Sequence, residues 1–120
     1  MRAITEYSLD EITGLPAGDA LDRLVWAAVW PDVPQMQLYP WCSPQRPDMA
    51  LLALSAYQHM RVIREYLIRA VTKGETVEYL VTLYPNVCHG KGDSLPLAIC
   101  RAIALNAWWR ARSLPAEDAI

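Results

Sequence analysis

The sequence predicts an α+β fold in which three amphipathic helices are layered with a small antiparallel sheet, similar to an α-β-α sandwich. Apolar residues recur at helical spacing in three segments and alternate in one nine-residue segment, and turn-forming residues separate these segments. With 120 residues, the chain is long enough to form a single domain with its own core.

The first helix is expected over residues 18–30. Gly18 or Asp19 supplies its N-cap, and Pro31 ends it because proline cannot continue a helix. Its apolar positions are three or four residues apart: Leu21, Leu24, Val25, Ala28 and Val29. Residues 1–14, which precede this helix, are expected to be an N-terminal extension.

Residues 31–47 are predicted to form a loop because five of them are prolines. Within this loop the sequence QMQLY, at 35–39, alternates between polar and apolar residues and suggests one short strand. Tyr39 and Trp41 are too apolar to remain in water, so we expect the loop to pack against the domain.

The second helix is predicted to be long, running from the N-cap Asp48 to about residue 72. Lys73 and Gly74 form a typical C-terminal stop. Its apolar stripe consists of residues at helical spacing: Met49, Leu52, Ala53, Ala56, Tyr57, Met60, Ile63 and Leu67.

The clearest strand is TVEYLVTLY, at 76–84, because apolar residues alternate along it. Pro85 and Asn86 provide a turn, and residues 87–89 are expected to be a short return strand. The final helix is predicted over 94–112, followed by a frayed tail at 113–120.

The segment CHGKGDSLPLAICRA, at 88–102, combines a thiol, an imidazole and two glycines around a lysine. A phosphate-binding P-loop requires a GxxxxGK[ST] pattern, and both the first glycine and the final hydroxyl residue are missing here. We therefore interpret the segment as the entrance to the last helix, with glycines that permit a change of direction. The alternative is an anion or nucleotide site at this helix end, formed by Lys91, Gly92, Ser94 and Arg101.

No catalytic, metal or cofactor site is predicted. Cys88 and His89 are adjacent and would point to opposite faces of a strand, so they do not form a catalytic dyad. Cys100 falls on the apolar face of a helix, which is typical of an inert core thiol. The cysteines and histidines also lack the spacing of a zinc site.

Tryptophans and arginines near the end of the last helix suggest a contact surface. Trp108 and Trp109 are about 100° apart around a helix, so one narrow buried stripe cannot contain both. We predict that one tryptophan stays partly exposed and that the region binds a partner or a second copy of the chain. The predicted contact residues are Trp108, Trp109, Arg110 and Arg112, together with Tyr39 and Trp41 of the proline-rich loop.

The composition excludes several classes of protein. A net charge of −2 argues against a general nucleic-acid binder, and no apolar run approaches the ~18 residues needed to cross a membrane. The acidic N-terminus lacks the apolar core of a secretory signal. An odd number of cysteines, three, is typical of reduced thiols, so we expect a cytoplasmic protein.

The sequence from residue 93 to 107 resembles the closing helix of the phage ABA sandwich domain family. Seven positions fit that family's pattern: Ser94, Pro96, Ala98, Ile99, Cys100, Arg101 and Ala102. AGDALDRLVWAAVW, at 17–30, is similar to the family's opening helix. The chain departs from the family in residues 1–14, which have no counterpart, and in the short segment 85–92, where a longer strand hairpin is usual.

The resemblance implies an α-β-α layered protein encoded by a phage or prophage, and it brings no catalytic residues. We therefore expect a non-enzymatic phage protein in the host cytoplasm that occupies a host protein and inhibits a host defence system. One alternative is a protein that sequesters a small nucleotide in an aromatic and arginine-lined pocket. Others are a structural or accessory phage protein and an enzyme that uses Cys88, His89 and Lys91.

Overall fold

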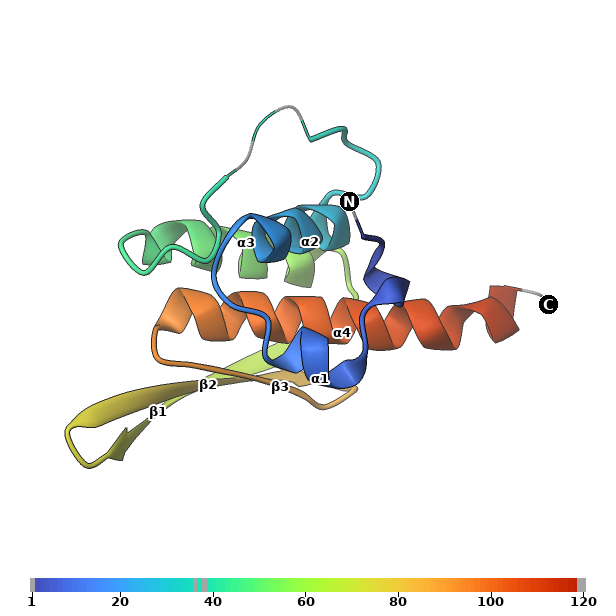
Figure 1. The fold of residues 1–120 in the computed structure, drawn as a ribbon. Coiled ribbons are helices and arrows are strands. Elements are labelled where there is room, and N and C mark those ends of the chain that lie inside the picture. Colours follow the sequence, from blue (N-terminus) through green and yellow to red (C-terminus); the bar gives the residue numbers. More distant parts are fainter. Residues whose placement is uncertain (1, 36, 38, 119–120) are drawn as a thin grey trace.

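The structure, a computed structural model, describes residues 2–35, 37 and 39–118. Over these residues it confirms the predicted α+β class, with α-helices and a three-stranded antiparallel sheet in the order β1-β2-β3 (Figure 1). The elements in chain order are the 3-10 helix η1 (Ile4–Glu6), α1 (Leu9–Thr13), α2 (Asp19–Val29), α3 (Pro47–His59), β1 (Glu65–Lys73), β2 (Thr76–Tyr84), β3 (Cys88–Gly92) and α4 (Leu95–Asp118).

The elements form three layers with α4 in the middle. Helices α2 and α3 pack on one side of α4, and strands β2 and β3 pack on the other (Figure 1). Residues 96–100 and 102–106 of α4 are all buried, as expected for a helix that is covered on both sides. The sheet is therefore an outer layer, with α4 on one face.

The long helix predicted over 48–72 is wrong in its second half. Helix α3 ends at His59, and Arg61 has a φ of 62°, in the left-handed region that an α-helix cannot include. Residues 65–73 form β1, which pairs with β2 along its whole length. Gly74, predicted to be a helix stop, lies in the tight turn between β1 and β2 with a φ of 64°.

The end of the chain also differs from the prediction. Strand β2 has the predicted bounds, but β3 extends to Gly92, so Gly90 and Gly92 lie in a strand. Helix α4 continues to Asp118, beyond the predicted end at residue 112. The predicted strand at 35–39 includes Met36 and Leu38, which are outside the described residues; Gln35, Gln37 and Tyr39 do not belong to a strand.

The N-terminal segment is packed onto α4. Tyr7 and Ile12 are buried in the core, and the indole N–H of Trp108 donates to the Tyr7 carbonyl at 2.8 Å. Ser8 caps α1 in a reciprocal capping box with Glu11. In the described part of the chain, no helix is long and apolar enough to cross a bilayer.

Candidate binding groove

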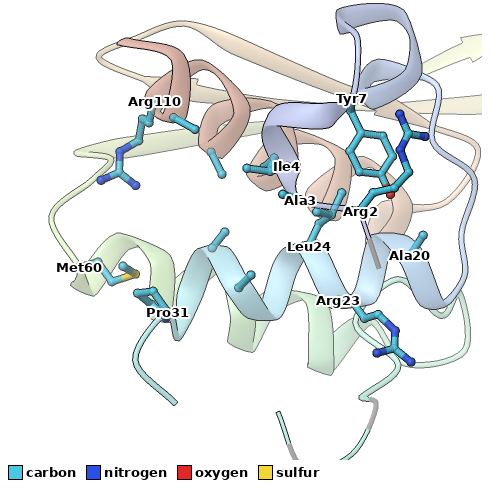
Figure 2. Close-up of a pocket in the computed structure, with 14 residues that line it drawn as sticks. Arg2, Ala3, Ile4, Tyr7, Ala20, Arg23, Leu24, Pro31, Met60 and Arg110 are labelled. Carbon is cyan, nitrogen blue, oxygen red and sulfur yellow. The ribbon is translucent and has the colours of Figure 1, made fainter. Parts of the chain in front are cut away.

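A groove of about 1020 Å³ lies between the N-terminal segment, α2 and α4 (Figure 2). Six of the residues that line it are alanines, from all three elements: Ala3, Ala20, Ala27, Ala28, Ala107 and Ala111. Larger apolar side chains complete the surface: Ile4, Tyr7, Leu24, Pro31 and Met60.

The geometry of α2 explains why the groove stays open. Leu21, Val25 and Val29 are buried in the core, whereas Ala20 and Ala27 are exposed on the groove side. An alanine ends at Cβ, so these positions leave space that longer side chains would fill. The small side chains of Ala20 and Ala27 therefore help to keep the apolar surface concave.

Three arginines and no carboxylates line this groove: Arg2, Arg23 and Arg110. In Figure 2, Arg110 lies near the end of the groove marked by Pro31 and Met60, and Arg2 lies near Tyr7 at the opposite end. The groove is thus apolar along its floor and has a guanidinium group near each end.

Two of these arginines are positioned by neighbouring side chains. Arg2 forms an ion pair with Glu11 at 2.9 Å and lies 4.0 Å from the centre of the Tyr7 ring. The hydrogen bond from Arg2 and the capping contact with Ser8 lower the pKa of Glu11 to about 2.

Arg110 lies near the buried hydroxyl of Tyr57. Burial raises the pKa of Tyr57 to about 12, and the nearby Arg110 opposes that rise. The Tyr57 hydroxyl donates to the Asn106 side chain at 2.6 Å.

At the predicted anion site the Arg101 side chain bonds within the chain, whereas Lys91 is exposed. The Arg101 guanidinium donates to the carbonyls of Leu15 at 2.9 Å, Lys91 at 2.8 Å and Gly14 at 3.4 Å. These bonds join the residues that follow α1 to β3. The Ser94 hydroxyl caps α4 by accepting from the Leu97 N–H, and Gly92 is buried.

The predicted contact surface at 108–112 contains both buried and exposed side chains. Trp108 is buried, and Trp109 is 45% exposed and meets the Trp108 ring edge-on with ring centres 4.9 Å apart. This confirms that one of the two indoles stays partly exposed. Arg112 stacks 4.1 Å from the centre of the Trp108 ring and also donates to the Tyr7 carbonyl. Arg110 alone of these four residues lines the groove.

Tyr39 and Trp41 belong to an aromatic cluster that holds the proline-rich loop against α2. Trp26 stacks on Tyr39 with ring centres 5.4 Å apart, and Trp30 stacks on Trp41 at 5.1 Å. The Trp26 indole also donates to the Val33 carbonyl at 2.9 Å. Trp41 is buried. Because the rings stack on one another, they cover much of each other's faces.

All three cysteines are buried. Cys42 donates through both its backbone N–H and its thiol to the Asp22 carboxylate, each at 3.0 Å. The neighbouring Cys42 thiol and burial raise the pKa of Cys100, and burial raises the pKa of Cys88. His89 is exposed and contacts Thr82 at 2.9 Å. Within the described residues, no three His, Cys, Asp or Glu side chains are grouped as metal ligands.

The sequence-based prediction missed most of the groove. Of its lining residues, only Arg110 was among the predicted contact residues. A signal was present in α2 and α4, where alanines occupy positions that surface helices usually fill with charged residues. Sequence alone did not indicate that these alanines face one another.

No family model, curated protein or solved structure matches this chain. The class of protein is therefore defined by its own fold and groove. It is a small α+β protein with a cationic, alanine-lined groove next to its central helix.

Proposed function

We propose that this chain is a non-enzymatic binding protein that holds an acidic, amphipathic helix of a partner protein in the groove. The observation that carries the proposal is the lining itself, which combines an apolar floor with three arginines and no carboxylate. A partner helix with one apolar face and acidic flanks matches both properties.

The dimensions of the groove favour a helix of a few turns. α2, which forms one wall, has eleven residues and is about 16 Å long. The alanines let the backbone of a partner helix approach closely, because they add little bulk above the groove floor. Guanidinium groups bind carboxylates through two parallel hydrogen bonds, so Arg110 would fix the orientation of an acidic residue on the partner.

The resemblance to phage ABA sandwich domains suggests where the partner comes from. We propose that it is a host protein, a component of a defence system, and that occupancy of the groove inhibits that system. The groove supports a protein partner in general, and the assignment to host defence depends on the resemblance.

The alternative of a nucleotide-binding protein has less support. Stacking of a base requires an accessible aromatic ring, yet Trp26, Trp30, Tyr39 and Trp41 stack on one another. Tyr7 is the aromatic residue in the groove lining, and Arg2 lies over its ring.

A labelled peptide can test the proposed function. The probe is a 14-residue helical peptide with leucines at helical spacing and glutamates on both flanks, and its matched control has lysines in place of the glutamates. Fluorescence anisotropy should show saturable binding of the glutamate peptide and much weaker binding of the lysine peptide. Equal binding of both peptides, or of neither, would contradict the proposal.

Two substitutions locate the binding. Ala27→Leu should fill the groove and weaken binding of the glutamate peptide, whereas Ala17→Leu, at an exposed position outside the groove, should not. Arg110→Glu should weaken the glutamate peptide and strengthen the lysine peptide. A melting temperature raised by a cyclic dinucleotide, with no response to either peptide, would favour the nucleotide alternative.

A further inference from the structure

Strand β1 forms one edge of the sheet and is unusually open. It is nine residues long, and all of its residues except Ile68 are exposed. Three of them are large and apolar: Tyr66, Leu67 and Val71 are 38%, 46% and 37% exposed. In the described part of the chain, β2 is the element that packs closely against β1.

The edge lacks two of the features that usually prevent strands from pairing between molecules, a bulge and a proline. Its register with β2 is continuous from Glu65 to Lys73, so no bulge bends it. It contains no proline, and the hairpin extends past the first turn of α4, where that helix does not cover it (Figure 1). A long and regular edge of this kind, with apolar residues between its charges, is a template for another strand.

We propose that β1 pairs antiparallel with β1 of a second copy of this chain, which joins the two sheets into one of six strands. The two-fold axis passes midway between the Leu67 residues of the two copies, so that their side chains lie opposite each other. We call this an axis through Leu67. Glu65 of each copy then lies opposite Arg69 of the other, and Tyr66 lies opposite Ile68. This inference is independent of the proposed function.

The pattern of charges selects this register. Glu65, Leu67 and Arg69 lie on the sheet face away from α4, because their neighbours Tyr66 and Ile68 pair with Leu83 and Val81, which are buried. With the axis at a residue, rather than between two neighbouring residues, directly opposite residues of the two copies come from the same face of the sheet. Each face of the joined sheet therefore stays continuous. An axis through Leu67 places two Glu–Arg pairs on that face, and opposite charges across strands are stabilising.

The neighbouring registers are unfavourable. An axis through Arg69 would place Glu65 opposite Lys73, which is already paired with Glu78 at 3.0 Å. It would also place the two Arg69 guanidinium groups directly opposite each other, and like charges in that position destabilise a sheet. An axis through Ile68 would place Arg69 opposite Leu67 and Glu65 opposite Val71, which pairs charged residues with apolar ones. No ion pair within the described residues involves Glu65 or Arg69, so both side chains are available for the partner.

Charge reversal tests both the dimer and its register. Sedimentation equilibrium should show a dimer for the wild-type chain. Glu65→Arg and Arg69→Glu each place two like-charged pairs across the axis, so each variant alone should dimerise about tenfold or more weakly. An equimolar mixture of the two variants should dimerise again, because opposite charges then face each other at both positions.

The double variant Glu65→Arg/Arg69→Glu provides a second test. Two copies of it again place opposite charges across the axis, so it should dimerise like the wild type. Both side chains are exposed, and circular dichroism should show an unchanged fold. A wild-type monomer at every accessible concentration would overturn the proposal. Single variants that dimerise like the wild type, or a mixture that stays monomeric, would also overturn it. A wild-type chain that binds an unrelated strand-forming peptide but does not pair with a second copy would point to a different partner and overturn self-pairing.

Discussion

Replacement of Gly90 by alanine should strongly destabilise the protein, because α4 lies directly on this strand residue. A Cβ at Gly90 would be 2.1 Å from the Ala98 carbonyl oxygen and 2.4 Å from the Ala102 nitrogen. Both are backbone atoms of the central helix, so no side-chain rotation can relieve the overlap. The helix would have to move by about 1 Å to reach the shortest tolerated separation.

The expected cost is at the upper end of the range for overpacked cores, about 3 kcal/mol or more. For a chain of this size the total stability is about 6–15 kcal/mol, so the loss is a large fraction of it. A change of this size should lower the melting temperature by roughly 10 °C. Urea unfolding followed by circular dichroism measures the difference directly.

Gly14→Ala is the matched control. Its Cβ would meet the Asp10 carbonyl oxygen at 3.4 Å, an ordinary contact, so its stability should change by less than about 0.5 kcal/mol. Gly92→Ala should be intermediate, because its Cβ would be 3.0 Å from the Leu97 side chain. If Gly90→Ala unfolds at the same urea concentration as the Gly14→Ala control, α4 does not pack on β3 as described.

Three further outcomes follow from buried or paired groups. The pKa of Glu11, lowered to about 2 in the folded chain, should be measurable by carbon NMR; its contribution to stability is present above the ordinary pKa of 4.5 and is lost as the pH falls toward 2. Arg2→Ala should raise that pKa, and an unchanged value would argue against the ion pair. Tyr57→Phe leaves the Asn106 side-chain oxygen without its donor and should cost about 1–3 kcal/mol in denaturant unfolding. The three cysteines are buried and should react with a thiol reagent only as fast as the chain opens, so rapid labelling of the native protein would contradict their placement.

The second helix shows how local pattern and tertiary pairing can disagree. Ile63 and Leu67 continue the helical spacing of α3, which favoured one long helix. The same segment, YLIRAVT, is rich in aromatic and β-branched residues, a composition that suits a strand. Pairing with β2 decides between the two, and it depends on residues that the local window does not include.

The glycines of CHGKGDSLPLAICRA were interpreted from sequence as turn residues. Gly90 instead lies in a strand, where its missing Cβ makes room for Ala98 and Ala102. The small side chains of Ala98 and Ala102 also help α4 to approach the strand this closely. The part played by the glycine was not predictable locally, because the contact joins residues eight and twelve positions apart.

The candidate site was the least predictable part. Residues 108–112 could be recognised as a mixture of buried and exposed positions, since adjacent helical residues face different directions. The groove, by contrast, forms where the outer face of α2 meets Ala107 and Ala111 of α4. Which helix surfaces remain uncovered depends on the whole packing arrangement.

Chemical-shift mapping of the glutamate peptide on the isotopically labelled protein tests the proposed binding groove most directly. The backbone amide signals of Ala27, Ala107 and Arg110 should move together during the titration and yield one dissociation constant, while those of β1 remain in place. Shifts that concentrate on the β1–β2 hairpin or on the aromatic cluster, with the groove signals unchanged, would contradict the assignment of the groove as the binding site.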